Sequence, residues 1–345
     1  MAAASPTRRG IGNRDLHALP QGLSGSRLDC LALLSDWSSA PQEEWSAMPE
    51  IRLPSFPFTP QLGWSTTRSE TFRACRRRYF YQYYGKFDSE IPLEQILHLK
   101  GLSSIPMMVG TAVHDVLATL LKRLLRSVDP IDRERFARHT ERTLSGLLSG
   151  LELMETYYGK RPLPEAAELL EPVQSCLERF LASERYSWVR DQLNSDPPWL
   201  IEPPGYGETR LRGHKIYAKV DVLIRLPGQT VILDWKSGRQ DPAKHTRQLL
   251  GYAAWAEHNL QIPAGDIRCV LAYLQPDYQE LEKQPSSDEL DGLAVEVAAE
   301  IQQMQALCRD PERNIPHEKQ AFPLTDNAGI CRNCQFRELC DRIDY

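Results

Sequence analysis

The sequence has no uninterrupted apolar run near the roughly 18 residues that a membrane-spanning helix requires, so we expect no membrane segment and no membrane partner. No secretory signal, no internal repeat and no G-x4-G-K-[S/T] phosphate loop is visible; the last absence excludes the usual helicase motor. The 345 residues are otherwise ordinary for a globular chain, with 41% hydrophobic and 25% charged. These values exclude a wholly disordered or fibrous protein.

The chain also lacks a large excess of charge of one sign. Its 41 basic residues stand against 46 acidic ones, a formal net charge of −5, which argues against a protein coated in positive charge but permits a local basic patch. Residues 65–86 contain six basic side chains and one acid, interleaved with aromatic residues. Guanidinium groups neutralise phosphates and aromatic rings stack on unpaired bases. We therefore expect nucleic-acid binding here, with a solvated helix face over core aromatics as the alternative; the arginines concerned are Arg73, Arg76, Arg77 and Arg78.

The order of patterns along the chain predicts one domain behind a leader. Residues 1–64 are rich in Ala, Ser, Pro and Gly, and we expect a disordered leader; an organellar transit peptide and a start at Met48 are alternatives. The domain spans 65–345 and begins with a helix whose capping box is Thr67 with Glu70. A helical insertion is expected at about 115–200, followed by alternating strands and helices. This order predicts an α/β core in which helices flank a central sheet.

The segment 215–238 is predicted to be an acidic hairpin. Asp234 and Lys236 are two residues apart on a strand, so their side chains project from the same face. Asp221 lies opposite Asp234 if the loop is Pro227-Gly228, and opposite Lys236 if the loop has four residues. We favour the longer loop because L-proline is unfavourable at the start of a two-residue hairpin loop. Two carboxylates beside an amine form a site for Mg²⁺ or Mn²⁺, although a surface hairpin with an ordinary ion pair would share this pattern.

Three of the eight cysteines form a Cys-x2-Cys-x5-Cys motif at 331–340, and Cys75 could add a distant fourth thiolate. Four such ligands suit either zinc or an iron–sulfur cluster. A zinc site could recruit Cys308 or His317 in place of Cys75, and disulfides are the remaining alternative. Metal ligation in a chain of this size favours a reducing, cytoplasmic location.

Six short motifs, in order over residues 65–345, resemble the PD-(D/E)XK nuclease superfamily. The resemblance is to its RecB/AddB-like branch, which includes CRISPR-associated RecB-like exonucleases and carries a C-terminal iron–sulfur motif. The motifs are the segment from Ser69 to Cys75 and on to Tyr81, Gly110-x3-His114, Gly213 leading to Asp221, Asp234-Trp-Lys236-Ser-Gly238, Gln248-x3-Tyr252, and Cys331-x2-Cys334-x5-Cys340. The sequence departs at Arg76, where the family often has proline. The resemblance implies a restriction-endonuclease-like core, with a central mixed sheet flanked by helices and a cluster joining the N- and C-terminal parts.

The resemblance also implies roles for individual residues. The ligands of a catalytic Mg²⁺ or Mn²⁺ would be His114, Asp221, Asp234 and the backbone carbonyl of Trp235. Lys236 would position and activate the attacking water, and Gln248 with Tyr252 would hold the substrate strand. A [4Fe–4S] cluster would be bound by Cys75, Cys331, Cys334 and Cys340.

The function implied is exonuclease action on single-stranded DNA ends in repair, recombination or CRISPR adaptation. A helicase or CRISPR adaptation proteins would be the partners. The alternative is a non-catalytic Fe–S nucleic-acid-binding subunit of a helicase–nuclease complex. The intact Asp221, Asp234 and Lys236 argue against that alternative.

Overall fold

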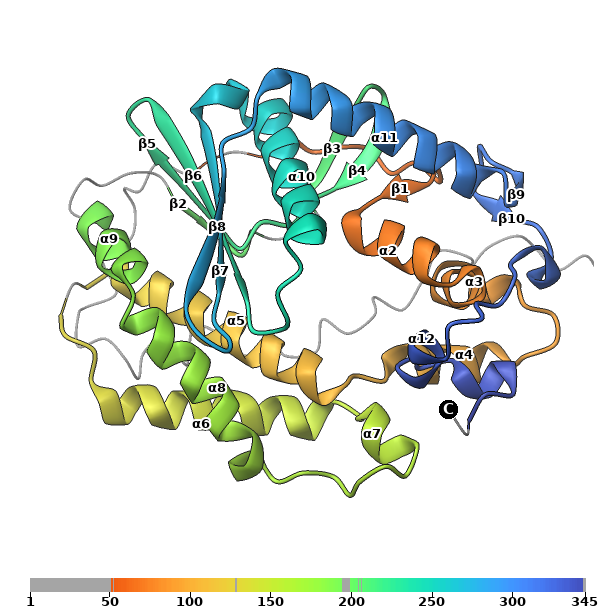
Figure 1. Ribbon diagram of the computed structural model, residues 1–345, viewed down its shortest axis with the longest axis horizontal. Helices are drawn as coiled ribbons and strands as arrows, with labels where there is room; N and C mark the ends of the chain where they lie inside the picture. The colour runs from red at the N-terminus through yellow and green to blue at the C-terminus, as the bar shows by residue number, and fades with distance from the viewer. Residues whose placement is uncertain are drawn as a thin grey trace, which may run out of the picture.

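A five-stranded mixed sheet forms the centre of the molecule (Figure 1). The computed structural model describes residue 51 and residues 53–127, 129–193, 199–203, 205 and 207–343, so the leader expected at 1–64 lies largely outside the described residues. The strand order is β2-β5-β6-β7-β8, and only β6 and β7 are parallel. The bounds are β2 (Trp199–Ile201), β5 (Val222–Leu226), β6 (Gln229–Lys236), β7 (Ile267–Tyr273) and β8 (Gln279–Lys283).

Helices cover both faces of this sheet. One face carries α10 (Pro242–Leu260), which connects the parallel strands β6 and β7, and α11 (Ser287–Gln305). The other face carries α5 (Ile105–Leu124), α6 (Arg133–Gly150), α8 (Ala166–Leu181) and α9 (Glu184–Gln192). Alternate residues of β6 supply the two cores, since Val231 and Leu233 pack toward α5 while Ile232 packs toward α10. This α/β arrangement is consistent with a restriction-endonuclease-like fold.

A second group of elements brings the N- and C-terminal parts of the described chain together. Aromatic packing joins them: the rings of Phe80 and Phe322 lie 5.0 Å apart, and those of Tyr81 and Phe336 lie 5.5 Å apart. The helical elements of this group are α2 (Thr66–Ala74), α3 (Arg76–Tyr84), η2 (Gly85–Phe87), α4 (Leu93–Gly101), α7 (Met154–Tyr157), η5 (Lys319–Ala321), α12 (Ala328–Arg332) and η6 (Arg337–Cys340). The short η4 (Ala264–Asp266) instead lies between α10 and β7 in the chain and contacts α10 and α11. Two small sheets complete the fold: β1 (Gly63–Trp64), β4 (His214–Tyr217) and β3 (Glu208–Leu211), and β9 (Cys308–Asp310) with β10 (Ile315–Pro316).

The helix α5 is long and apolar enough, by length and composition alone, to cross a membrane. No such segment was expected from the sequence. In the structure its apolar side chains, such as Val113 and Leu117, are fully buried in the core beside the sheet. The core helix of a globular domain has the same composition, so α5 is explained by its packing.

Two predicted elements are each divided in the structure. The helix expected from Thr67 begins at Thr66, with Ser65 as its N-cap, and ends before Cys75. Cys75 has extended backbone and its thiol caps α3 by accepting a hydrogen bond from the Arg78 N–H. The first part of the predicted hairpin, residues 215–226, is divided between β4 and β5, which belong to different sheets.

The predicted four-residue hairpin loop is wrong. Val222 pairs with Leu233 and Leu226 with Gln229, so the loop is Pro227-Gly228. Gly228 has φ 72°, as the third position of a type II turn requires, and that turn favours proline just before it. Continuing the register places Asp221 opposite Asp234.

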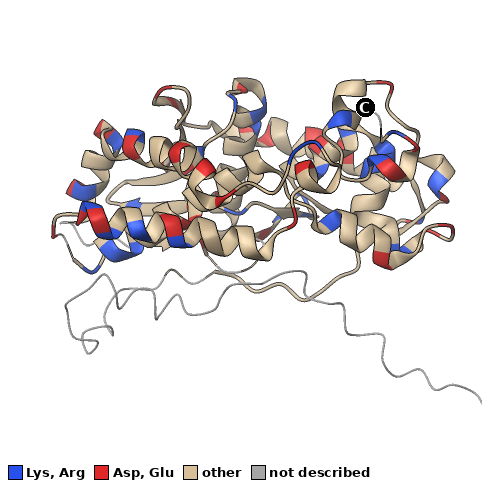
Figure 2. Cartoon of the chain, turned by 90° about the horizontal axis from the view of Figure 1, so that it is seen from below, with Lys and Arg blue, Asp and Glu red and all other residues tan. Residues whose placement is uncertain are grey.

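The charged residues are mixed along the helices. Lys and Arg positions lie among Asp and Glu positions along the ribbon of the described residues in the view of Figure 2. The arrangement agrees with the small net charge of −5.

Candidate active site

The two aspartates and the lysine of the predicted hairpin meet at the end of β6. Asp234 is almost fully buried, with 1% of its side chain exposed, and its Oδ1 lies 2.5 Å from Lys236 Nζ. Asp221 Oδ2 accepts a hydrogen bond of 3.3 Å from the Trp235 backbone N–H. The period-two pattern therefore correctly placed Asp234 and Lys236 on one face, beside Asp221.

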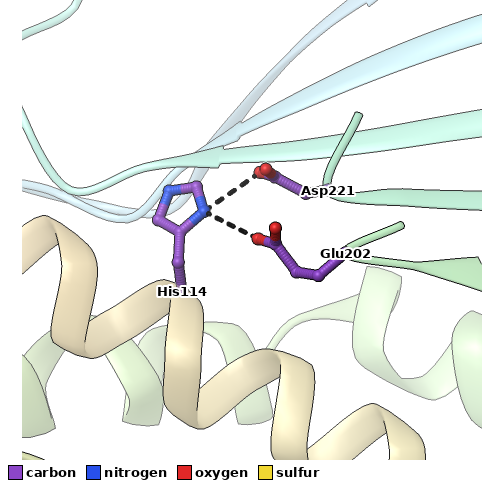
Figure 3. Close-up of side chains that lie close together, drawn as sticks. All are labelled: His114, Glu202 and Asp221. Carbon is purple, nitrogen blue, oxygen red and sulfur yellow. Dashed lines mark ion pairs between the residues drawn. The ribbon is translucent and has the colours of Figure 1, made fainter. Parts of the chain in front are cut away.

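His114 reaches the same point from α5. Its Nε2 lies 3.1 Å from the Trp235 carbonyl oxygen, and its Nδ1 lies 3.3 Å from Asp221 Oδ2 (Figure 3). One turn earlier on α5, a Cβ at Gly110 would lie only 3.2 Å from the Ser237 hydroxyl oxygen. Glycine at this position lets the helix approach the end of the hairpin closely, which brings the imidazole to the carboxylates.

Glu202 is a member of the site that the sequence patterns did not reveal. It follows β2 in left-handed backbone, with φ 45°, and its N–H donates a 2.8 Å hydrogen bond to the Asp221 carbonyl. Its Oε1 lies 3.8 Å from His114 Nδ1, and its Oε2 lies 2.7 Å from Lys219 Nζ. One ligand atom each from His114, Glu202 and Asp221 lies within 4.8 Å of the others (Figure 3).

The electrostatics of the site are those of crowded negative charge. Burial and the charge of Asp234 raise the pKa of Asp221 above its ordinary value. Burial alone would lower the pKa of His114, but the Asp221 carboxylate and its neighbours raise it to about 10. Burial alone would also lower the pKa of Lys236, but the charges of Asp234 and Asp221 outweigh burial and raise it. Lys236 is therefore an ammonium that donates hydrogen bonds in this state.

Gln248 and Tyr252 lie one turn apart on α10 and both contact the Asp234 carboxylate. The Tyr252 hydroxyl donates a 2.5 Å hydrogen bond to Asp234 Oδ2, and Gln248 Nε2 lies 3.4 Å from the same oxygen. Gln248 also donates to the Tyr252 hydroxyl at 2.5 Å. These contacts orient Asp234, and the expected contact with a substrate strand stays a prediction.

The donor set fits a divalent metal ion. Two carboxylates, one imidazole and a backbone carbonyl are hard or borderline ligands, which suit Mg²⁺ and Mn²⁺. The buried repulsion between Asp221 and Asp234 would be relieved by a dication between them. Among the described residues, the acidic and histidine side chains whose ligand atoms lie close enough together to hold such an ion are His114, Glu202 and Asp221. Ligation by Asp234 and by the Trp235 carbonyl stays a prediction.

The four arginines predicted to bind nucleic acid lie in α2 and α3. Arg73 keeps 58% of its side chain exposed and forms an ion pair with Glu300. Arg77 Nε donates a 2.9 Å hydrogen bond to the Phe322 carbonyl, which ties α3 to the C-terminal segment. The other two, Arg76 and Arg78, are half-buried. Arg73 and Arg77 thus already have partners within the protein. Nucleic-acid binding by the four arginines stays a prediction.

The four cysteines predicted to act together line one pocket between α3 and the C-terminal segment; they are Cys75, Cys331, Cys334 and Cys340. Arg342 donates a 2.9 Å hydrogen bond to Cys331 Sγ. Among the described residues, no three of these sulfur atoms lie within 4.8 Å of one another. The seven cysteines in the described part of the chain are free of disulfides. Cys308 and His317, the alternatives for a zinc site, are not among the residues that line the pocket.

Comparison with known proteins identifies a family for most of the chain. The model of the PD-(D/E)XK nuclease superfamily matches residues 63–341. A solved structure described as the crystal structure of SSO0001 is similar over 65% of this chain and 95% of its own, with 16% sequence identity and a TM-score of 0.28. No curated protein matches the chain.

Proposed function

Since the chain belongs to the PD-(D/E)XK nuclease superfamily, and is thereby a phosphodiester hydrolase, we propose that it is an exonuclease that cleaves single-stranded DNA from its ends. The observation that carries the catalytic part is a connected set of contacts at the end of β6: His114 contacts Asp221 and the Trp235 carbonyl, Asp221 accepts from the Trp235 N–H, and Lys236 pairs with Asp234. The preference for single-stranded ends comes from the motif resemblance to the RecB/AddB-like branch, as do a role in repair, recombination or CRISPR adaptation and a helicase or adaptation-protein partner.

Each side chain of the site would have a separate role in hydrolysis. A divalent ion bound here would polarise the scissile phosphate and lower the pKa of water beside it. Tyr252 and Gln248 hold the Asp234 carboxylate in one orientation. Lys236, fixed by Asp234, presents its ammonium hydrogens to the attacking water and to the charge that develops on the phosphate. His114 must give up its proton to act as a ligand, so loading the site releases a proton.

We further propose that the four cysteines hold a [4Fe–4S] cluster in a protein of the cytoplasm. Tetrahedral zinc, with Zn–S near about 2.3 Å, would bring its sulfurs to roughly 3.8 Å from one another. The lining of one pocket by all four cysteines supports a group that they share. N–H groups of Arg78 and Arg342 donate to two of the sulfurs, as hydrogen bonds to cluster sulfurs commonly do. The ligands are Cys75, Cys331, Cys334 and Cys340.

Cleavage of labelled oligonucleotides tests the catalytic proposal. A 5′-labelled single-stranded 30-mer should be shortened from an end with Mn²⁺ or Mg²⁺ and stay intact with EDTA, while a circular single strand should resist cleavage. Asp234→Asn should lower the cleavage rate by a factor of about 10³ or more, because the neutral amide loses a charged metal ligand, while oligonucleotide binding without metal persists.

The matched control is Asp266→Asn, which changes an exposed aspartate in η4 and should cleave at the wild-type rate. Equal rates for Asp234→Asn and wild type would refute the site. Cutting of the circular strand would make the enzyme an endonuclease, and a wild-type protein that binds but never cleaves would be the non-catalytic subunit.

A further inference from the structure

A groove opens beside the catalytic carboxylates, between the first turn of α2 and one face of α10. Its volume is about 240 Å³, somewhat below the roughly 300–1,000 Å³ of sites that hold a whole drug-sized ligand. Its walls come from β1 and α2 on one side, from the end of β4 through Lys219 on another, and from α10. The residues that line it are therefore distant in sequence and are gathered by the fold.

The groove is continuous with the active site. Gln248 and Tyr252 line it, and the same two side chains hydrogen-bond to Asp234 Oδ2. Lys219 also lines it and forms the 2.7 Å ion pair with Glu202, whose other oxygen faces His114. A ligand in the groove would therefore contact side chains that themselves contact the carboxylates of the proposed metal site.

The walls carry the two chemistries that a nucleotide needs. Lys219 keeps 55% of its side chain exposed, so its ammonium can contact a phosphate. The Tyr217 ring lies against the backbone at Gly63, where any Cβ would overlap it, and so forms a fixed aromatic wall. Aromatic rings of this kind stack on unpaired bases without regard to sequence.

The floor of the groove depends on a missing side chain. Gly251 lies in the interior of α10 between Gln248 and Tyr252, and a Cβ at Gly251 would meet no atom within 4 Å beyond its own helix backbone. Glycine in a helix interior costs about 1 kcal/mol relative to alanine. The absence of a side chain at Gly251 therefore leaves this part of the groove open.

We propose that this groove is the subsite for the nucleotide next to the scissile phosphate of a single strand. Its phosphate contacts Lys219, its base lies along Tyr217, and Gly251 leaves the room for it. The inference rests on the proposed nuclease function for its substrate, and it adds the place where the strand lies.

Binding without metal tests the subsite apart from catalysis. The dissociation constant of a fluorescein-labelled dT oligonucleotide is measured by anisotropy in EDTA, across salt concentrations, for full-length protein. Gly251→Leu should weaken binding at least tenfold because its side chain fills the groove. Lys219→Ser should weaken binding and reduce the slope of log K against log salt by about 0.7, the value for one lost phosphate contact on a single strand.

Gly292→Leu is the matched control, since Gly292 is an exposed glycine in the interior of α11 that also has no atom within 4 Å of a built Cβ. It should bind as the wild type does. Thermal melting of each variant shows whether it is folded. If Gly251→Leu is unfolded, the binding measurements on Lys219→Ser provide the test. Wild-type affinity and salt slope in the folded variants would overturn the subsite. Failure of the wild type to cleave would overturn the nuclease proposal and leave this binding result standing.

Discussion

At the scale of single residues, the site depends on two carboxylates held close together out of water. Asp221 and Asp234 repel each other, and Lys236 and His114 supply the nearby positive charge in the metal-free protein. A dication would replace part of that charge and let His114 become neutral. Glu202 extends the acidic group on the side of His114, so its charge should contribute to the affinity for the ion.

Glu202→Gln should therefore weaken Mn²⁺ binding by about tenfold, in the range found when groups around a metal site are altered. The measurement is a titration in which electron paramagnetic resonance reports free Mn²⁺. Glu208→Gln is the control, because Glu208 also pairs with a cation, Arg210, but lies outside the group around His114. Equal Mn²⁺ affinity in Glu202→Gln and wild type would remove Glu202 from the site.

At the scale of elements, local patterns predicted side-chain faces better than element ends. The spacing of Asp234 and Lys236 was enough to place both on one face of β6. The break at Cys75 was not predictable from helical periodicity, because Phe72, Cys75 and Tyr79 keep the same spacing whether or not the helix is continuous. The helix breaks at Cys75 because this residue has extended backbone and its thiol caps the N-terminus of α3.

Glu202 shows the other limit of sequence patterns. Its position beside Asp221 results from the pairing of Ile201 with Val222, a contact between β2 and β5. Nothing in the three residues of β2 specifies that partner, and the proline that follows Glu202 suggests only a turn. Long-range strand pairing, rather than any local motif, completes the acidic group.

The helix α6 provides a test at this scale. Burial and the neighbouring Arg142 charge lower the pKa of His139 from 6.5 to about 4. Because the unfolded chain binds this proton more readily, the stability contributed by neutral His139 is complete above pH 6.5 and is lost as the pH falls toward 4. The loss should reach about 2 kcal/mol at pH 5.

Urea unfolding at pH 8 and pH 5 measures this loss. His139→Leu should show a fall in the free energy of unfolding that is about 2 kcal/mol smaller than the wild-type fall. His317→Leu, at an exposed histidine, should behave as the wild type. An equal fall in His139→Leu and wild type would show that His139 does not titrate as its burial requires.

At the scale of the whole molecule, the cysteine pocket joins the start of the catalytic domain to its end. Cys75 lies between α2 and α3, while the other three thiols follow the last described strands. A cluster held by all four closes a loop that contains the entire sheet. Ligation of this kind contributes directly to the free energy of folding.

Cys75→Ser should therefore lose most of the bound iron, weaken the broad absorption near about 400 nm of thiolate-bound iron–sulfur, and lower the free energy of unfolding by roughly 3 kcal/mol or more. Cys308→Ala should keep the iron, because Cys308 lies outside the pocket. Anaerobic purification with iron and zinc analysis measures both. A colourless, zinc-loaded wild type, or iron loss in Cys308→Ala, would contradict the assignment of the four ligands.

The arrangement around the catalytic carboxylates is tested most directly by locating the ion. Crystals soaked in Mn²⁺ should give one strong anomalous peak within about 2.1–2.3 Å of a ring nitrogen of His114, an oxygen of Asp221, an oxygen of Asp234 and the Trp235 carbonyl oxygen, as octahedral oxygen-rich sites require. In crystals of Asp234→Asn the peak should be weak or missing. A Mn²⁺ ion bound elsewhere, with these four groups bare at saturating metal, would contradict the account.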